Sequence, residues 1–413
     1  MSRKRVVITG MGAVTPFGVG VDLYWDSLLE AKSGIGPITL FDHSKHDVHF
    51  GGEIPNFQPE LYLDRKLTKR LDRYSQLAMV ASHEAAKMAS YDASSVDPAR
   101  VSVIFGSGIG GMNELEQQMA RLMTKGPSKV SAFTIPKLMV NAASGNISIA
   151  FGAKGNSSAV SSACASATHA MGVALDILRR GQADIVFTGG SEAALTPLAT
   201  AAFASMKALS TRNDDPQRAS RPFDKDRDGF VLAEGAGAVV MEELDHAQKR
   251  GAAILAEVIG FAASSDADHI TQPSESGDKA ASAMSDALGD AGVTPADVDY
   301  INAHGTSTPL GDLAETLAIK RVFGNCADRV IVSSTKSAVG HSLGASGGLE
   351  LIACVRAAQN GVVPPTINLD VPGEGCDLNY CPNRPQDRKI LVAMTNSFGF
   401  GGHNACLIIR RFE

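Results

Sequence analysis

Short runs of β-branched and aliphatic residues alternate along the whole chain with longer segments whose apolar residues recur at helical spacing. The short runs are typical of buried strands. They predict strands over 5–12, 101–108, 183–190, 237–244, 252–262, 298–305, 329–336, 389–397 and 404–411. Helical spacing is found over 75–89, 277–292, 313–324 and 348–359. Strands that alternate with helices predict an α/β fold with mostly parallel sheets.

The same order of predicted strands and helices occurs twice along the chain. The segment GAVVMEEL (237–244) closes the first series much as NACLIIRRF (404–412) closes the second. A chain of 413 residues is also longer than a single hydrophobic core usually serves. We therefore predict two duplicated α/β halves, over residues 1–251 and 252–413.

Composition narrows the class of protein. The chain is 44% hydrophobic and 20% charged, which argues against disorder, and its net charge of −6 provides no overall basic field for nucleic acid. No run approaches the ~18 apolar residues of a membrane helix. The apolar run at the N-terminus is too short for a signal peptide. Six scattered cysteines without a CxxC motif favour reduced thiols and a cytoplasmic protein, and we expect no nucleic-acid or membrane partner.

Three motifs resemble ligand sites but lack a required part. GSGIGG (106–111) fits a dinucleotide loop, but no acidic residue follows about 20 positions later. DKDRDGFVLAEG (224–235) begins like a calcium loop and has Gly235 where the closing glutamate belongs. A polar segment without a helical i, i+4 pair carries three residues that we interpret as solvated histidines: His43, His46 and His49.

A lone cysteine, Cys164, lies in VSSACASATHAMGVAL (160–175), where a small-residue run leads into a helical pattern. Free cysteine is often a buried packing residue. A thiol at a helix N-terminus is also a candidate nucleophile, since the helix dipole there lowers its pKa. The segment alone leaves both interpretations open.

Three further segments favour catalysis. NAHGTSTPLGD (302–312) contains His304, SSTKSAVGHSLGASGGLE (333–350) contains Lys336 and His341, and TNSFGFGGHN (395–404) is a glycine loop. Each follows a predicted strand, at the edge where α/β sheets place their sites. Packing alone does not explain why a cysteine, two histidines and a lysine all lie at such strand ends.

With VVITGMGAVTPFG (6–18) and SRPFDKDRDGFVLAEGAG (220–237), these motifs resemble those of the β-ketoacyl-acyl-carrier-protein synthases, the condensing enzymes of the thiolase-like superfamily. The resemblance covers essentially the whole chain. It implies a five-layered α-β-α-β-α thiolase-like fold and an acyltransferase without a cofactor. The implied reaction is a decarboxylative condensation of an acyl-enzyme with malonyl carrier protein in fatty-acid elongation. Ile109 resembles the bulky pocket residue of the synthase II branch.

The resemblance also implies a role for each matching residue. Cys164 accepts the acyl group, and its own N–H and that of Phe400 form the oxyanion hole. His304 and His341 donate to the enolate oxygen, and Lys336 orients or charges this pair. Supporting roles fall to Glu350, as the partner of Lys336, and to Asp312. The residues implied to contact substrate are Ile109, Thr306, Thr308, His269, Phe398 and Phe400.

Two less specific sites follow from the same resemblance. Relatives hold a monovalent cation at positions matching Asn302, Glu350, Asn396 and Ser397. They dock the acidic carrier protein at positions matching Arg65, Lys66, Lys69, Arg70 and Lys207. A solvated helix face is the alternative for this basic run. A homodimer is implied, with the apolar segment 133–139 at its interface. A polyketide ketosynthase of the same chemistry remains open, whereas Cys406 inside a predicted strand disfavours a thiolase.

Overall fold

The computed structural model describes residues 3–413, and its first five long strands form one end of a large sheet. In spatial order these strands are β6 (Ser157–Val160), β5 (Val101–Gly106), β7 (Ile185–Glu192), β8 (Gly235–Glu243) and β1 (Val6–Thr15). The ladders of β5 with β6 and with β7 are parallel, and those of β8 with β7 and with β1 are antiparallel.

The strands of the second half repeat this arrangement. In spatial order they are β11 (Ile331–Ser333), β10 (Tyr300–Asn302), β14 (Val392–Gly399), β15 (His403–Arg410) and β9 (Ala256–Ser265). Numbered by chain order within each half, both sets run 3-2-4-5-1, with the same parallel and antiparallel pairs. The repeated hydrophobic pattern of the sequence therefore corresponds to a repeated topology.

The two sets of strands join into one hydrogen-bonded sheet. The start of β1, Val6–Ile8, pairs with both β8 and the start of β9. The expectation of mostly parallel sheets was wrong, because β8, β1, β9 and β15 all pair antiparallel with their neighbours. In the second half the reason is visible at Gly399 and His403, which face each other in a β14–β15 hairpin. A hairpin needs no crossover helix and reverses the chain direction.

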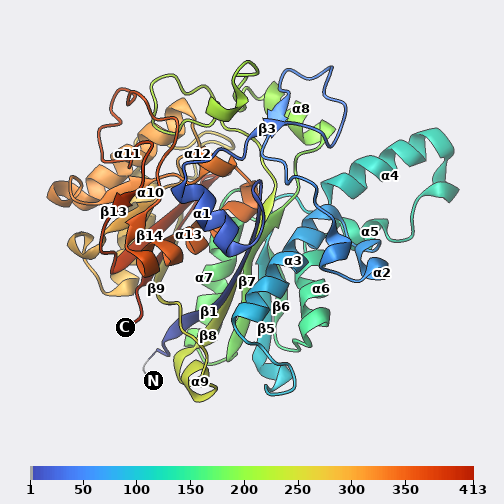
Figure 1. The fold of residues 1–413 in the computed structure, drawn as a ribbon, viewed down its shortest axis with the longest axis horizontal. Helices are drawn as coiled ribbons and strands as arrows, with labels where there is room; N and C mark the ends of the chain where they lie inside the picture. The colour runs from blue at the N-terminus through green and yellow to red at the C-terminus, as the bar shows by residue number, and fades with distance from the viewer. Residues whose placement is uncertain (1–2) are drawn as a thin grey trace.

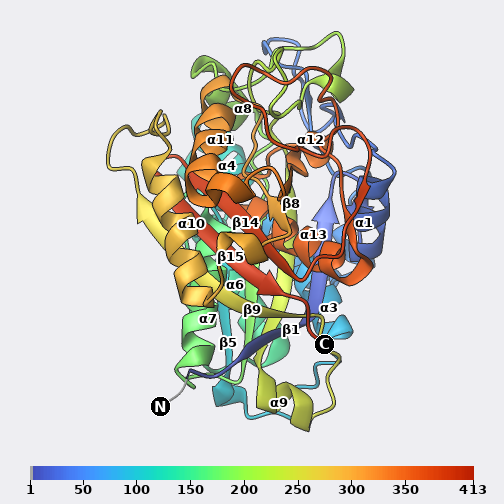
Figure 2. The ribbon, with the colours of Figure 1, turned by 90° about the vertical axis from the view of Figure 1, so that its left-hand side faces the viewer.

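Helices complete a five-layered arrangement, which agrees with the expected thiolase-like layers (Figure 1). Between the two halves of the sheet lie α7 (Ser166–Arg179) and α13 (Ser346–Asn360). Outside the first half lie α3 (Arg73–Met88) and α6 (Ala142–Phe151). Outside the second half lie α10 (Asp278–Ala291), which covers β9 and β15, and α11 (Pro309–Phe323) (Figure 2).

Glycines permit the closest contacts between these layers. A Cβ at Gly12 of β1 would lie 1.9 Å from the carbonyl oxygen of Ala81 in α3. A Cβ at Gly237 of β8 would lie 2.4 Å from the backbone of Gly348 in α13. Real Cβ atoms do not approach backbone this closely, so any larger residue at either position would push a helix off the sheet.

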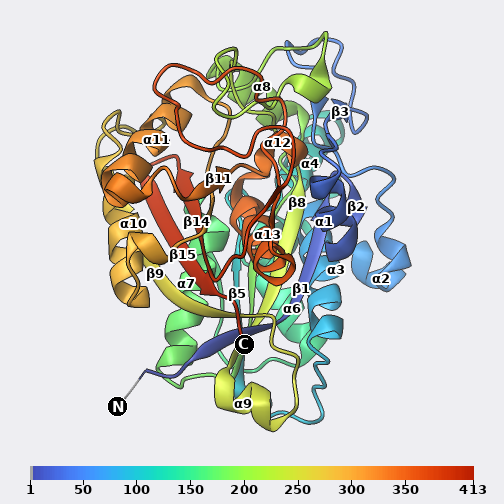
Figure 3. The same cartoon turned by 60° about the vertical axis from the view of Figure 1, so that its left-hand side comes forward.

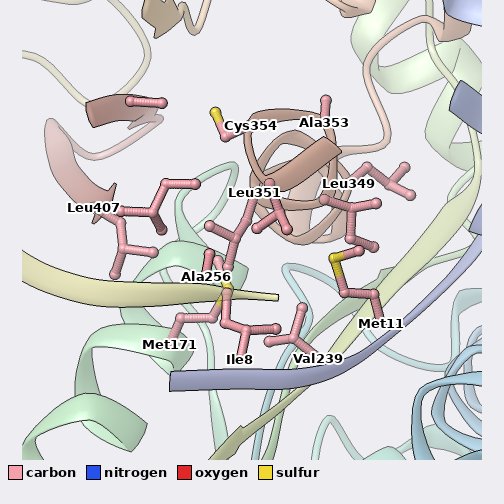
Figure 4. Packing of buried hydrophobic residues seen from close by; sticks show 14 of the residues in the cluster. Ile8, Met11, Met171, Val239, Ala256, Leu349, Leu351, Ala353, Cys354 and Leu407 are labelled. Atoms are coloured by element: carbon pink, nitrogen blue, oxygen red, sulfur yellow. The ribbon is translucent and has the colours of Figure 1, made fainter. Parts of the chain in front are cut away.

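The central core is built from both halves of the chain (Figure 4). Leu349 and Leu351 of α13 pack with Ile8 and Met11 of β1 and with Met171 of α7. All five side chains are buried, and burial of each contributes about 1.5–3 kcal/mol. The central helices therefore fix the position of one half against the other.

The remaining α-helices lie outside these layers. They are α1 (Val21–Leu29), α2 (Arg65–Thr68), α4 (Met112–Lys125), α5 (Thr134–Leu138), α8 (Pro197–Ser205), α9 (Leu244–Lys249) and α12 (Lys336–Val339), and α9 lies at the opposite end of the molecule from α8. Figure 3 shows α8, α11 and α12 at one end of the molecule and both termini toward the other. Among residues 3–413 no helix combines the length and the hydropathy needed to cross a bilayer.

Strand β6 was not predicted from the sequence. It has only four residues, two of them serines, and it pairs with β5 alone at the edge of the sheet. A short polar edge strand leaves no period-two hydrophobic signal. Its position matters, because the chain turns from β6 directly into the segment that carries Cys164.

Candidate active site

Loops from both halves of the chain enclose a cavity of about 690 Å³ at the carboxyl ends of the parallel strands. The loops after β5, β6 and β10 and the end of β14 all contribute to its wall. The predicted site residues that line the cavity are Cys164, His304, His341, Ile109, Thr306, Thr308, Phe398, Phe400 and Lys207. The fold thus brings together groups that are more than 200 residues apart in the sequence.

Cys164 occupies a tight turn between β6 and α7. Ala163, just before it, has a φ of 50°, a left-handed conformation that costs a non-glycine residue of order 1 kcal/mol or more. Hydrogen bonds hold this turn, since Ser166 Oγ donates to Ala163 O at 2.6 Å and accepts from Ser162 N at 2.9 Å. The turn places the thiol in the wall of the cavity.

The glycine loop after β14 lies against this turn. A Cβ at Gly399 would lie 3.0 Å from the backbone nitrogen of Cys164, so glycine is needed for the loop to come this close. Hydrogen bonding from the backbone N–H groups of Phe400 and of Cys164 lowers the pKa of the thiol. The two N–H groups implied as an oxyanion hole are therefore on the same side of the cavity as the thiol.

Burial raises the pKa of the Cys164 thiol to about 11, against the smaller lowering by the Lys336 charge and by the two N–H groups. The sequence-based expectation of a lowered pKa was wrong. Desolvation disfavours the thiolate more than the start of α7 favours it, and Cys164 precedes the first residue of that helix, Ser166. The thiol is protonated at neutral pH, so it must lose its proton as it reacts.

The two histidines are neighbours in the cavity wall. The ring centroids of His304 and His341 are 5.4 Å apart, and the rings are nearly perpendicular. Burial lowers the pKa of both well below the usual histidine range, and the positive charge of Lys336 lowers both further. Both rings are therefore neutral at pH 7, and a neutral imidazole has one N–H donor. His341 Nδ1 lies 3.0 Å from Ser346 Oγ, which holds the ring in place.

Lys336 is buried and forms an ion pair with Glu350, the partner predicted from the sequence. Both side chains are 2% exposed. A buried ammonium group without such a partner would carry a large desolvation cost. The pair therefore keeps a positive charge close enough to act on Cys164 and on both histidines.

Glu315 of α11 is a site residue that the sequence did not reveal. Its carboxylate accepts the backbone N–H groups of His304 and Gly305, each at 2.8 Å, and the side-chain amide of Asn396 at 3.1 Å. It fixes the backbone of the loop that carries His304. No local pattern distinguishes Glu315 from other glutamates of a helix, because its partners lie in other segments.

Asp312 has a similar position beside the threonine loop. Its carboxylate accepts from the backbone N–H groups of Ser307 at 3.1 Å and Phe223 at 2.8 Å, and burial raises its pKa to about 7. Asp312 thus holds the loop that follows His304, and it does not line the cavity.

The side chains implied to contact substrate mostly lie on the cavity wall. The hydroxyl oxygens of Thr306 and Thr308 are 3.1 Å apart on one side. Ile109 packs in the same apolar cluster as Cys164. Phe398 lies against the His304 ring, at 5.8 Å between centroids.

His269 differs from the sequence expectation. It is exposed and does not line the cavity. Its Nδ1 accepts the backbone N–H groups of Thr271 and Gln272, both at 3.1 Å, and those two residues are in the cavity wall. The histidine therefore shapes the turn and does not itself contact the interior.

The residues implied to hold a monovalent cation fit that role unequally. Both polar atoms of the buried Asn302 side chain and Glu350 Oε2 have no hydrogen-bond partner among residues 3–413. The other two side chains are already bonded, since Asn396 Oδ1 accepts from Cys406 and Ser397 Oγ bonds Thr168. Oxygen atoms of Asn302 and Glu350 suit a small hard cation.

The basic residues predicted for docking divide into two places. Lys207 follows α8 at the cavity mouth, apart from α2 (Figure 1). The other four are exposed on and beside α2: Arg65, Lys66, Lys69 and Arg70.

Comparison with known proteins agrees with this geometry. The model of the beta-ketoacyl synthase N-terminal domain matches residues 3–247, and that of the C-terminal domain matches residues 255–370. Proteins named 3-oxoacyl-[acyl-carrier-protein] synthase 2 are 48% identical to this chain in Synechocystis sp. and in Staphylococcus aureus. The alignments cover 100% and 99% of this chain and 99% of each relative.

A solved structure shows the same fold. A ketosynthase of a type II polyketide system, in complex with its acyl-carrier protein, has a TM-score of 0.92 at 33% identity, with 100% of both chains covered. This likeness to a ketosynthase confirms the expected thiolase-like fold. The chain belongs to the beta-ketoacyl synthase family.

Proposed function

We propose that this protein is a 3-oxoacyl-[acyl-carrier-protein] synthase of the synthase II type, which elongates fatty acyl chains by decarboxylative condensation. One observation carries the proposal: a thiol, two backbone N–H groups and two neutral imidazoles meet on one largely apolar cavity. This set matches a reaction that needs a nucleophile, an oxyanion hole and donors to a developing enolate.

In the first stage the Cys164 sulfur attacks the carbonyl carbon of an acyl carrier-protein thioester. A new S–C bond forms, the bond to the carrier sulfur breaks, and the carrier leaves as a thiol with the proton that Cys164 gives up. The N–H groups of Cys164 and Phe400 stabilise the negative oxygen of the tetrahedral intermediate. A neutral imidazole is able to accept the proton in transit.

In the second stage a malonyl thioester enters and loses CO₂. The C–C bond to the carboxylate breaks, and its electron pair becomes an enolate whose oxygen accepts hydrogen bonds from His304 and His341. The enolate carbon then attacks the acyl-Cys164 carbonyl, and the thiolate that leaves regains a proton. Burial keeps both imidazoles neutral, the Lys336 charge adds to this effect, and neutral rings donate their N–H to the oxygen without losing the proton.

Different parts of the cavity wall suit different parts of the substrate. Ile109 and Phe400 offer apolar wall to the acyl chain, while the hydroxyls of Thr306 and Thr308 suit the amides of a pantetheine arm. Asn302 and Glu350 are the side chains we assign to a monovalent cation beneath the site. The halves over 1–251 and 252–413 then have separate roles, the first supplying the nucleophile and the second the histidines.

The direct test is the product. With an acyl carrier-protein thioester and malonyl carrier protein, we expect a 3-oxoacyl thioester two carbons longer than the starter, with one CO₂ released per turn. Mass spectrometry of the carrier protein detects both changes. A poly-β-keto chain built by repeated condensation would instead support the polyketide alternative. No product would overturn the proposed function.

The carrier protein is the partner we propose, docked on the exposed basic residues of α2. Changing Lys66 and Lys69 to glutamate should raise the KM for carrier-protein substrates about tenfold with little change in kcat, because docking precedes chemistry. Changing the exposed Lys249 of α9 to glutamate, away from α2, is the control. An unchanged KM in the Lys66/Lys69 variant would show that this charge run is only a solvated helix face.

We also propose a homodimer in the cytoplasm. Large apolar side chains are exposed on α4, α5 and α6, with Met123 78%, Ile135 61% and Ile149 82% exposed. The neighbouring edge strand β6 has an unpaired side as well. A second copy would cover both features. Sedimentation at micromolar concentration tests this, and a monomer would contradict it.

All six cysteines are free, which supports a reducing compartment.

A further inference from the structure

Glu192, the last residue of β7, is a buried carboxylate with 0% exposure that none of the roles above uses. Four groups donate to it. Ser107 Oγ and the Ile109 N–H donate to Oε1 at 2.9 and 3.2 Å. The N–H groups of Gly108 and Gly344 donate to Oε2 at 2.7 and 3.1 Å. Burial raises the pKa of the Glu192 carboxyl, and the hydrogen bonds from these four groups lower it. Backbone N–H groups cannot accept a carboxyl proton, so these donors favour the ionised form.

These four donors belong to two loops that are distant in the sequence. One loop, 107–111, follows β5 and carries Ile109, and the other lies between His341 and α13 and carries Leu343. Ile109 and Leu343 both line the cavity and share one apolar cluster with Cys164. The Glu192 carboxylate therefore connects two walls of the cavity beside the thiol.

The local sequence is adapted to this contact. A Cβ at Gly108 would lie 2.8 Å from Glu192 Oε2, and one at Gly344 would lie 2.7 Å from the same oxygen. A Cβ at Gly344 would also lie 2.4 Å from the backbone nitrogen of Gly108. Leu343 has a φ of 45°, which a leucine adopts only when its surroundings impose it. Two glycines and a strained leucine thus fit around one carboxylate.

We propose that Glu192 is a positioning residue for acyl specificity, which holds Ile109 and Leu343 at a fixed separation beside Cys164 and so limits the acyl chain lengths that the cavity accepts. The inference rests on the proposed function and deepens it. Glu192 contacts no substrate and acts through the two loops. Its negative charge also acts on Cys164, in the direction opposite to Lys336.

The test variant is Glu192→Gln. The amide has one acceptor oxygen, which serves either the Gly108 and Gly344 pair or the Ser107 and Ile109 pair, while its NH₂ faces the other. If the oxygen serves the glycines, the Ile109 N–H loses its acceptor and its loop loosens. We expect the ratio of the highest to the lowest kcat/KM, measured across carrier-protein substrates from hexanoyl to tetradecanoyl, to fall about tenfold. Loss of one charged hydrogen bond produces a change of this size.

A second readout does not need the reaction. Because Glu192→Gln removes a negative charge near the thiol, alkylation of Cys164 by iodoacetamide should become faster and its pH profile should shift to lower pH. A residue that only stabilises the fold would not produce this shift. The alkylation result therefore separates an effect at the thiol from a loss of stability.

The matched control is Glu242→Gln. Glu242 is equally buried but is bonded to Thr9, His246 and Arg250, and it does not line the cavity. It should lose stability without changing either readout. If Glu192→Gln does not fold, Ser107→Ala removes one donor and should narrow the chain-length spread less, in the same direction. If the wild type is active and Glu192→Gln alters neither the chain-length dependence of kcat/KM nor the pH profile of alkylation, the inference is overturned. An inactive wild type overturns the proposed function instead.

Discussion

Replacing Cys164 with alanine is expected to abolish acyl transfer to the protein and to lower condensation by on the order of 10⁴-fold or more, the scale seen when a covalent nucleophile is removed. The wild-type protein should gain the mass of one acyl group when incubated with an acyl carrier-protein thioester. The variant should gain none. Intact-mass spectrometry measures both.

The other cysteines make this experiment specific. Burial raises the pKa of Cys354, Cys376, Cys381 and Cys406, and none of them lines the cavity. Cys326 is partly exposed and also outside the cavity, so Cys326→Ala is the control and should acylate normally. If acylation persists in Cys164→Ala, Cys164 is a packing residue and not the nucleophile.

Lys336→Met should give the second large effect, a loss of condensation that deepens as pH falls. The Lys336 charge lowers the pKa of both His304 and His341, so its removal raises both toward the ordinary value of about 6.5. Burial still holds both pKa values below that value in the variant, but at acid pH a larger fraction of its rings is protonated than in the wild type. We expect kcat to fall by about 10²–10³ at pH 6 and by less at pH 8.

The same change has a cost in stability that needs its own control. Lys336→Met leaves the Glu350 carboxylate buried without its partner, which destabilises a protein by about 3–5 kcal/mol. The double variant Lys336→Met/Glu350→Gln removes both charges and should recover much of the free energy of unfolding measured in urea. It should keep the altered pH profile. A profile identical to wild type in both variants would contradict an electrostatic role for Lys336.

Much of the site could be read from the sequence, because strand ends are local features. His304, Lys336 and Phe400 each follow a run of apolar residues that forms a strand, whereas Cys164 was singled out by the helical pattern that it precedes. The ends of parallel strands meet at one edge of a sheet, so these residues were expected to meet. The cavity wall contains Cys164, His304 and Phe400, and the charge of the buried Lys336 acts on Cys164 and His304.

Other members of the site had no local signal. Glu192 and Glu315 resemble any strand-end or helical glutamate until the loops they bind are folded around them. His269 resembled a cavity residue and instead holds a turn. Hydrogen bonds between distant segments leave no periodicity in the chain, so only the tertiary structure identifies their partners.

The sequence by itself determined the strand and helix pattern, its repetition and the chemistry-bearing residues, because side-chain periodicity and motif spacing depend on neighbours along the chain. Only the tertiary structure decided the mixed strand directions, the edge strand β6 and the protonation of the site. The thiol of Cys164 lies near a helix start, yet burial raises its pKa to about 11. Desolvation depends on every segment packed around a group, and no short stretch of sequence contains that information.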